Sequence, residues 1–504
     1  MQTTIFGPPG TGKTTTLINI VKQELDNGTK PENIAFVSFS RKAAEEARDR
    51  SAEALNIGAD QMVWFRTLHS FAFQNIGIGS KQVLKGSDYN QLGRLLGLEF
   101  ASNSSLTMAD GNLFSAGKGG DAYLALIRLA RVRGVSLEQQ FNDANDRRLY
   151  FQQLKIVNQV LLDYKRDTGK IDFVDMIEKF IDEGDCPLLD VLIVDEAQDL
   201  SPMQWKMIHD VMKPRAKRVY FAGDDDQCIY SWMGVNVKDF LNASDNKTIL
   251  HKSYRLPRSI HTIAEGMVSQ LSTRQEKVWM PKEESGVVVW HHDMLGLDLT
   301  SGEWLILART NYIANKIATD LKEQGYLFWR EGSGWSISPN VLTGIEVWLK
   351  LCKGIYLSAK ELRILSTLLK SDIVTKAGRK KLATLDSELT YNLESIRENF
   401  TTNVSAEMPW YDVLKVSERE RIYISSVRRM GEKILTNKPR IKISTIHKAK
   451  GGEADNVALL LDSSKPCAES PDQDSEIRTF YVGATRAKKA LHIIESQSMY
   501  GFKI

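Results

Sequence analysis

The chain has 504 residues, and its contents of 42% hydrophobic and 26% charged residues are ordinary for a folded protein. Its length predicts roughly three or four compact units, and its formal net charge of +3 neither requires nor excludes a nucleic-acid partner. No apolar run is long enough to span a bilayer, residues 1–6 lack the pattern of a signal peptide, and the 4 cysteines form no C-x-x-C pair. We therefore expect a multidomain cytoplasmic protein without a membrane partner, disulfide framework or zinc site.

Short apolar runs of strand length alternate with helical patterns in the first half of the chain. The runs lie at residues 2–6, 34–38, 62–65, 190–195 and 218–222, and the early helical patterns lie at 13–25 and 41–55. Strands that alternate with helices predict a parallel, doubly wound sheet. A second set of runs predicts a second sheet of this kind, at residues 286–290, 304–308, 441–444, 456–461 and 490–494.

Mainly helical segments interrupt both predicted cores. In the first, a Ser/Gly/Asn-rich stretch at 101–120 is followed by helical patterns at 123–133 and 147–165. In the second, helical patterns lie at 341–351, 359–369, 385–399 and 417–435, and residues 463–475 are predicted to form an exposed loop. The expected domains are a first core at 1–75 and 170–270 with an insertion at 76–169, and a second core at 271–335 and 436–504 with a reduced insertion at 336–435.

A glycine-rich loop, G-P-P-G-T-G-K-T at residues 7–14, lies between the first predicted strand and the first predicted helix. In this context glycines let backbone N–H groups face phosphate oxygens, while Lys13 reaches the β and γ phosphates and Thr14 binds Mg²⁺. The alternative is a glycine-rich turn without a ligand. The residues expected to contact the nucleotide are Gly7, Pro8, Pro9, Gly10, Thr11, Gly12, Lys13, Thr14 and Thr15.

Two acidic residues, Asp195 and Glu196, close the apolar run at 190–195. A P-loop fold uses one carboxylate at the end of such a strand for the metal and a second to polarise the attacking water. We assign the metal to Asp195 and the water to Glu196, which predicts hydrolysis of a nucleoside triphosphate. A solvated acidic pair is the alternative, and the apolar strand before it makes that alternative less favoured.

Further motifs follow in an order that resembles the UvrD/Rep/PcrA-type superfamily 1 DNA helicases over nearly the whole chain. They are V-S-F-S-R-K-A-A at 37–44, R-T-L-H at 66–69, V-D-E-A-Q-D at 194–199, G-D-D-D-Q-C-I-Y-S-W-M-G at 223–234, S-Y-R-L-P at 253–257, L-A-R-T-N at 307–311, T-I-H-K-A-K-G-G-E at 445–453 and Y-V-G-A-T-R-A at 481–487. The resemblance implies an α/β protein of two RecA-like P-loop parallel-sheet cores, each with a mainly helical insertion, that uses ATP and Mg²⁺.

The resemblance also implies roles for residues around the triphosphate. Gln227 would sense the γ-phosphate, and Arg255 and Arg486 would stabilise the charge that develops on it, with Arg486 as an arginine finger. Such an arginine is worth roughly 10³ to 10⁵ in rate. Tyr254 would stack on the base and Glu453 would contact the nucleotide.

A set of aromatic and polar residues falls where the resembling family contacts single-stranded DNA. Base stacking contributes about 1–3 kcal/mol per base and tolerates any sequence, so a few rings outweigh a small net charge. Aromatic residues at strand ends are otherwise more often packing residues. The residues expected to contact DNA are Phe39, Thr67, His69, Tyr230, Trp232 and His447.

The chain departs from the family pattern at three places. No glutamine that would read adenine precedes the glycine-rich loop, and Thr15 stands where the family tends to place an arginine against the base. Preference for ATP over other triphosphates is therefore in doubt. Met233 replaces an arginine that would contact DNA.

The chain has two basic clusters, one formed by Arg128, Arg131 and Arg133 and the other by Lys376, Arg379, Lys380 and Lys381. Each cluster is interpreted either as a contact with duplex DNA or as a solvated helix face.

The sequence thus predicts an ATP-dependent motor that moves along single-stranded DNA and unwinds single/double-strand junctions, as a monomer or with weak self-association. The resemblance implies movement in the 3′-to-5′ direction. One alternative is a translocase that displaces proteins from single strands without unwinding. A second alternative is a nucleotide-switched DNA-binding module whose hydrolysis only resets it.

Overall fold

The computed structural model describes residues 1–39, 41–55, 57–101, 119–383, 385–401, 404–431 and 439–504. The chain divides into two compact units, the first formed by Met1–Gly296 with Ile446–Ile504 and the second by Leu297–Thr445. Within the described residues, every helix is too short or too polar to cross a membrane.

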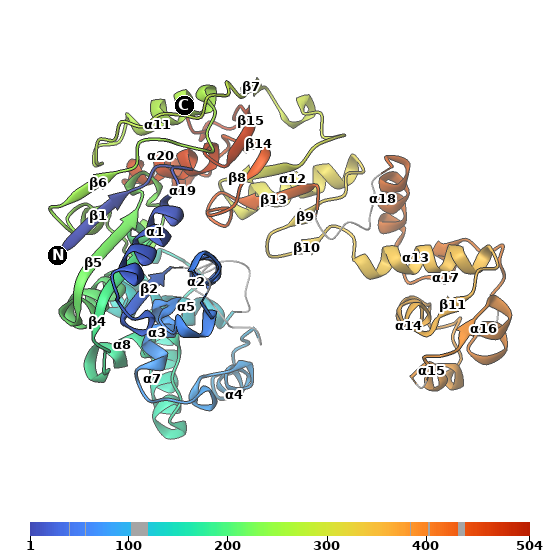
Figure 1. The fold of residues 1–504 in the computed structure, drawn as a ribbon. Coiled ribbons are helices and arrows are strands. Elements are labelled where there is room, and N and C mark those ends of the chain that lie inside the picture. The colour runs from blue at the N-terminus through green and yellow to red at the C-terminus, as the bar shows by residue number, and fades with distance from the viewer. Residues whose placement is uncertain (40, 56, 102–118, 384, 402–403, 432–438) are drawn as a thin grey trace. The chain divides into compact units, whose positions relative to one another are not determined.

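A six-stranded parallel sheet forms the centre of the first unit, in the order β3-β2-β4-β5-β1-β6. Strand β1 pairs with β5 on one side and β6 on the other, which brings the start of the chain beside segments more than two hundred residues away (Figure 1). The strands are β1 (Gln2–Phe6), β2 (Ile34–Ser38), β3 (Phe65–Thr67), β4 (Leu189–Asp195), β5 (Ala216–Gly223) and β6 (Lys247–Ile249).

Alternate residues of these strands face opposite layers of helices. Ile5 and Phe36 pack into one buried cluster together with Leu17 of α1 (Lys13–Asp26). The neighbouring residues Phe6 and Val37 pack into a second cluster on the other face. Both faces of the sheet are therefore covered, as is usual for parallel sheets. The remaining helices of this region are α2 (Arg41–Leu55), α3 (Leu68–Gln74), α8 (Phe173–Glu183), α9 (Pro202–Lys206) and α10 (Val237–Leu241).

One strand prediction for this sheet was wrong, and one strand was not predicted. The strand expected at 62–65 begins only at Phe65, because Met62 lies in a turn in which its carbonyl accepts a hydrogen bond from the Phe65 amide. Strand β6 was missed, since its three residues include the exposed Lys247 and carry no apolar run.

A separate helical segment follows α3 and has its own buried cluster, which includes Leu92, Leu126 and Leu161. Its helices are α4 (Gly86–Leu96), α5 (Asp121–Arg133), α6 (Leu137–Ala144) and α7 (Phe151–Thr168). Most of the Ser/Gly/Asn-rich stretch expected at 101–120 lies outside the described residues.

Arg128 and Arg131 of α5 fit neither of the two interpretations made from the sequence. Arg128 is only 4% exposed and donates a hydrogen bond to the Tyr89 hydroxyl. Arg131 lies 3.4 Å from Asp172, 2.5 Å from Asp175 and in contact with Glu178. Arg131 thus belongs to an internal ion-pair network, because the carboxylates at the start of α8 complement it.

A second, mostly parallel sheet has seven strands, so that the two sheets together are consistent with two RecA-like cores and confirm the predicted fold class. In the first unit, β15 pairs in parallel with both β14 and β7. In the second unit, β13 pairs in parallel with β8 and β9, while β9 and β10 are antiparallel. These strands are β7 (Val287–His291), β8 (Trp304–Ala308), β9 (Trp329–Arg330), β10 (Gly334–Trp335), β13 (Ile441–Thr445), β14 (Ala454–Leu460) and β15 (Ala487–Ile494).

Four of the described helices lie before or between the strands of this sheet along the chain. The prediction of a loop at 463–475 is partly wrong, because this segment contains α19 and the start of α20, for which Asp472 provides the N-cap. The helices are α11 (Arg258–Val268), α12 (Asn311–Glu323), α19 (Lys465–Ala468) and α20 (Gln473–Ala484).

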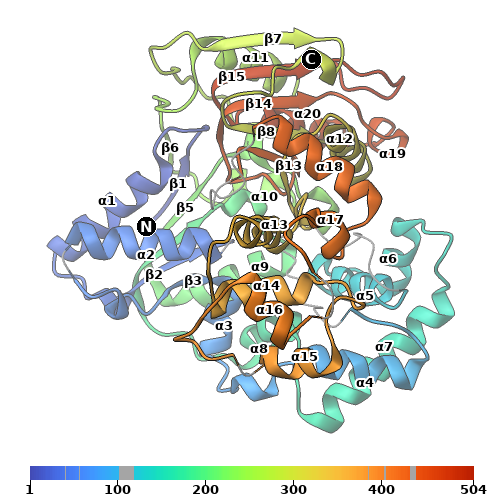
Figure 2. The same cartoon turned by 90° about the vertical axis from the view of Figure 1, so that its right-hand side faces the viewer.

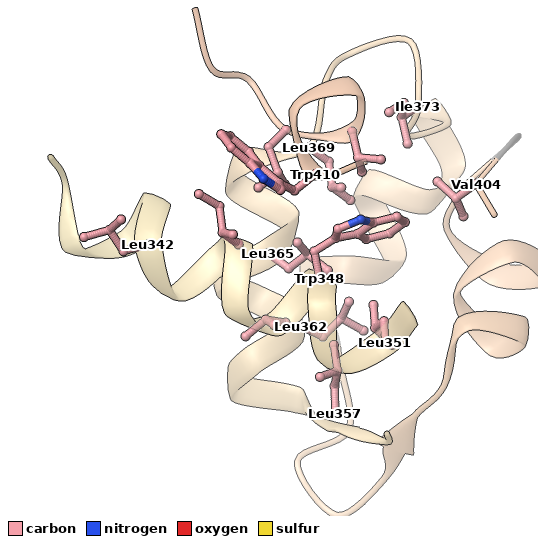
Figure 3. Close-up of a cluster of buried hydrophobic side chains, with 14 of the residues drawn as sticks. Leu342, Trp348, Leu351, Leu357, Leu362, Leu365, Leu369, Ile373, Val404 and Trp410 are labelled. Carbon is pink, nitrogen blue, oxygen red and sulfur yellow. The ribbon is translucent and has the colours of Figure 1, made fainter. Parts of the chain in front are cut away.

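The second unit also contains a group of helices that includes α13 and α14 (Figure 2), and Trp348 lies in their buried core (Figure 3). Trp348 is 1% exposed, and its indole N–H donates to the Met408 carbonyl at 3.0 Å. The elements are α13 (Pro339–Cys352), β11 (Leu357–Ser358), α14 (Ala359–Leu368), α15 (Lys376–Ala383), β12 (Thr390–Tyr391), α16 (Leu393–Asn399), α17 (Trp410–Val413) and α18 (Glu418–Arg429).

Two helix predictions in this cluster need correction. The single helix expected at 385–399 is wrong, because residues 390–391 form β12 and the Asn392 side chain caps α16 by accepting the Ser395 amide. The helix expected at 417–435 ends at Arg429, and residues 432–438 lie outside the described chain. In the basic stretch 376–381, the side chains of Lys376 and Arg379 are also outside it.

Candidate nucleotide and DNA site

The glycine-rich loop connects β1 to the N-terminus of α1. Gly10 and Gly12 adopt φ angles of 73° and 78°, which residues with a Cβ atom rarely adopt. Gly12 is also the N-cap of α1. The Thr11 hydroxyl donates to the Pro8 carbonyl at 2.8 Å and closes the loop. The first amides of a 14-residue helix thus lie beside the loop, an arrangement that favours an anion.

The segment 253–257 packs directly on this loop. The Ser253 hydroxyl donates to the Pro9 carbonyl at 2.7 Å, and the Tyr254 amide donates to the Gly10 carbonyl at 2.8 Å. A Cβ on Gly10 would lie 2.3 Å from Cβ of Arg255, so only glycine fits. Tyr254 itself is 70% exposed and close to Gly12, which leaves its ring available beside the loop.

Lys13 and the acidic pair at the end of β4 form a partly buried charge cluster. The Lys13 Nζ atom lies 2.9 Å from Oε1 of Glu196. Burial raises the pKa of Glu196, but Lys13 and Lys450 outweigh it and lower that pKa to about 2. Burial and the neighbouring Glu196 raise the pKa of Asp195 to about 7. Glu196 has a φ of 53°, an unusual conformation for a residue other than glycine, and such strain is concentrated at functional sites.

The donor atoms near the loop suit a magnesium ion held together with phosphate. Among the described residues, no group of three or more His, Cys, Asp or Glu side chains could hold a metal by itself. Mg²⁺ is usually bound through one or two carboxylates and completes its shell with phosphate and water. Ser38 pairs in the sheet with Asp195, and its buried hydroxyl has no hydrogen-bond partner within the described part of the chain. Thr14, Asp195 and this hydroxyl therefore fit a hydrated ion.

Gln227 and Arg486 meet although 259 positions separate them. The Gln227 amide nitrogen donates to Asp224 at 2.7 Å, and its oxygen accepts a hydrogen bond from Arg486 at 2.9 Å. Arg486 follows α20 and is 3% exposed; burial and the nearby Arg255 lower its pKa to about 10. Arg255 lies 2.7 Å from Glu453. The five residues named for catalysis, Lys13, Glu196, Gln227, Arg255 and Arg486, all belong to the first unit.

Lys450 is a residue of this site that the sequence reasoning missed. Its Nζ atom donates to the Asp199 carboxylate at 2.5 Å and to the Gln227 carbonyl at 2.6 Å. Burial raises the pKa of Asp199 to about 6, although Lys450 opposes this shift. The only signal in the sequence was its position inside T-I-H-K-A-K-G-G-E, three residues after His447.

The aromatic residues proposed for DNA form one cluster around Tyr230. The rings of Phe39 and Tyr230 stack with centroids 5.5 Å apart, and Trp232 and His447 lie 6.4 Å and 6.1 Å from Tyr230. Tyr230 is only 4% exposed, so its ring supports its neighbours, whereas Phe39 and Trp232 are half-buried. Lys450 lies 5.3 Å above the Tyr230 ring, which connects this cluster to Gln227.

Thr67, His69 and Met233 have structural contacts of their own. The Thr67 side chain caps α3 by accepting the Ser70 amide. Burial lowers the pKa of His69 to about 4, so that its ring, which lies edge-on to Phe173, is neutral at pH 7. Met233 is 2% exposed and packs inward.

The fold and this arrangement define a P-loop α/β protein with two sheets of the RecA-like kind and an arginine that reaches Gln227. The description "UvrD/REP helicase N-terminal domain" matches residues 1–248, and "UvrD-like helicase C-terminal domain" matches residues 358–498. The chain belongs to the UvrD/REP helicase family.

Individual relatives are distant. ATP-dependent DNA helicase PcrA of Bacillus subtilis is 26% identical over 311 residues, which cover 56% of this chain and 39% of that protein. A probable DNA helicase II homolog of Mycoplasma pneumoniae is 22% identical over 609 residues, which cover 99% of this chain and 82% of that protein. The chain thus matches less than half of the PcrA protein and most of the Mycoplasma one.

Proposed function

We propose that the protein is an ATP-dependent motor that moves along single-stranded DNA in the 3′-to-5′ direction and unwinds duplexes. The observation that carries this proposal is the hydrogen bond between Arg486 and Gln227, because it brings a cation from the end of the chain to the residue that would sense the γ-phosphate. The names of its relatives, ATP-dependent DNA helicase and DNA helicase II homolog, support the same activity.

In this proposal each group of the site has one task. The loop amides and Lys13 hold the phosphates, Thr14 and Asp195 hold Mg²⁺, and Glu196 orients the attacking water. When the nucleotide is bound, its γ-phosphate competes with Glu196 for Lys13, which frees the carboxylate for the water. Arg486 and Arg255 then stabilise the charge that develops on the transferred group.

The same proposal assigns the coupling between nucleotide and DNA to Lys450. It contacts Asp199 beside the acidic pair, the backbone of Gln227 and the face of Tyr230. A ligand that moves Gln227 should therefore also move Lys450 and Tyr230, and Tyr230 contacts the rings of Phe39 and Trp232. Alternate arrangements of these rings would advance the strand, driven by the different contacts of nucleotide in each state.

ATP hydrolysis with and without single-stranded DNA tests the motor directly. We expect strong stimulation by DNA in the parent protein and nearly no turnover in Lys13→Ala and Glu196→Gln. Glu196→Gln should still bind nucleotide, because it keeps the shape of the side chain and loses only the base. Equal rates with and without DNA would exclude the motor and favour a nucleotide-switched binding module.

The DNA contact is tested with two tryptophans. We expect Trp232→Ala to weaken binding of an oligonucleotide by roughly 1–3 kcal/mol, the contribution of one stacked base. Trp290→Ala is the matched control, because Trp290 is also a partly exposed indole, 47% exposed, on β7 away from the Tyr230 cluster. Equal losses in both variants would remove Trp232 from the proposed DNA path.

Unwinding and direction need their own assays. Strand displacement on duplexes with a 3′ or a 5′ overhang measures both, and translocation on single strands without displacement would support the protein-stripping alternative. Competition by other nucleoside triphosphates tests base selectivity. Since Thr15 offers only a hydroxyl, which accepts from Arg50 at 3.1 Å, we expect weak discrimination between bases.

A further inference from the structure

A lysine outside all the motifs lies at the centre of an acidic cluster under the phosphate-sensing residue. The side chain of Lys277 is 0% exposed. Its Nζ atom lies 2.5 Å from Asp225, 2.9 Å from Asp226 and 3.5 Å from Asp224. A buried ammonium held by three carboxylates is rare, because removing charges from water is costly unless they are matched.

The segment around Lys277 surrounds this acidic turn from several sides. Arg274 binds both carboxylate oxygens of Asp226, at 2.8 Å and 3.1 Å. The Gln275 amide donates to Asp225 at 2.7 Å, and Arg478 donates to the Asp225 carbonyl at 3.0 Å. Asp225 and Asp226 therefore have other partners, whereas Lys277 is the cation that pairs with Asp224 within the described part of the chain.

Asp224 in turn determines which way the Gln227 side chain points. One oxygen of Asp224 accepts the Gln227 amide N–H at 2.7 Å, so the amide oxygen faces Arg486 and accepts its N–H at 2.9 Å. An inverted amide would place N–H groups against a guanidinium, which also only donates. The Asp224 backbone is fixed as well, because its amide donates to Gln198, whose own amide donates to Glu196.

We propose that Lys277 is a positioning residue for ATP hydrolysis, which acts through Asp224 to orient Gln227 toward Arg486. Its buried side chain contacts the three carboxylates of the turn at 224–226. Removing Lys277 alone would leave three buried carboxylates short of a cation and would itself destabilise the fold, so the test has to separate turnover from folding. This inference rests on the proposed role of Gln227.

A double-mutant cycle separates positioning from a structural role. We expect Gln227→Ala to lower kcat by about 100-fold, in the range for one preorganised polar group. Lys277→Met should lower kcat by roughly 10- to 100-fold, as misplacement of a catalytic group does, while affinity for a fluorescent nucleotide analogue changes less than about threefold. In the double variant kcat should equal that of Gln227→Ala, because Lys277 acts through the missing side chain.

Two further variants distinguish an effect on turnover from loss of the folded state. Lys277→Met combined with Asp225→Asn keeps the net charge of the cluster, and Lys277→Arg keeps the cation but moves it from its central position. Lys165→Met is the matched control: Lys165 is also a buried lysine, 9% exposed and 2.6 Å from Asp172, but lies on α7 and should leave kcat unchanged.

Two results would overturn the role of Lys277 and leave the proposed role of Gln227 intact. One is a parental kcat in all folded Lys277 variants, and the other is a double variant in which the fold-losses of kcat of the two single variants multiply. A Gln227→Ala variant with parental kcat would refute the proposed role of Gln227 itself, and the inference with it. Loss of kcat in Lys165→Met equal to that in Lys277→Met would show that any buried lysine has this effect.

Discussion

Replacement of Gly10 by alanine tests whether the segment 253–257 must dock on the phosphate loop. Gly10 combines two constraints. Its φ of 73° disfavours a Cβ, and a Cβ at that position would lie 2.3 Å from Cβ of Arg255 and 2.8 Å from the Ser253 hydroxyl. Neither atom is the free end of a flexible chain, so the segment has to move.

The expected loss of stability in Gly10→Ala follows from the two constraints. A positive φ costs an alanine about 1–2 kcal/mol, and overpacking of a close contact costs roughly 1–3 kcal/mol more. Gly28→Ala isolates the first cost, because Gly28 has a φ of 86° and a Cβ added there would meet nothing within 4 Å. Both substitutions restrict the unfolded chain equally, so that contribution cancels in the comparison.

Chemical denaturation and steady-state hydrolysis measure the outcome. Gly10→Ala should be less stable than Gly28→Ala by about 1–3 kcal/mol, and its kcat should fall at least about tenfold as Arg255 leaves its place. Gly28→Ala should keep the parental kcat per folded molecule. Equal stability of the two variants, together with parental turnover of Gly10→Ala, would refute the docking argument.

Three further predictions concern parts of the chain away from the loop. Arg131→Ala should destabilise the first unit by about 1–3 kcal/mol in chemical denaturation, since Asp172 and Asp175 lose one cation but keep Lys165; lower DNA affinity with unchanged stability would instead favour a phosphate contact. Burial raises the pKa of Asp172, but Lys165 and Arg131 outweigh it and hold that pKa well below its usual range. Because the folded-state pKa is depressed, the stabilisation is complete above the unfolded value of about 3.9 and is lost as the pH falls below it. The difference in Tm between the parent and Asp172→Asn should therefore be largest at neutral pH and shrink under acid; a gap that grows under acid would contradict the sign. Trp348→Ala should cost about 3–5 kcal/mol in the unfolding of the second unit, whereas retained cooperativity and stability would show that the core of Figure 3 can close around the loss.

Local chemistry of the chain was predictable from the sequence. The strand at 2–6 and the helices starting at 13 and 41 follow from short-range periodicity, and the conformation of the phosphate loop follows from glycines in it. Short elements such as β6 and β12 were missed, because two or three residues carry no periodic signal and form only where a neighbouring strand pairs with them.

The chemical identity of the site residues could likewise be predicted from the sequence, but the residues that they contact could not. No pattern near residues 128–133 shows that carboxylates at 172–178 pair with Arg131, so the sequence could not distinguish this internal network from a basic surface. Lys450 and Lys277 looked like ordinary lysines, and only their contacts with Asp199 and with the turn at 224–226 distinguish them.

The sequence by itself determined which groups exist: a phosphate loop, an acidic pair at a strand end, arginines and aromatic rings in a fixed order. Tertiary structure decided which of them meet, placing Arg255 against Gly10, Arg486 on Gln227 and Lys277 beneath Asp224. The physical reason is that conformational preferences act over a few neighbouring residues, whereas hydrogen bonds and ion pairs at this site join positions separated by tens to hundreds of residues. Packing of the whole unit is needed to bring those positions within bonding distance.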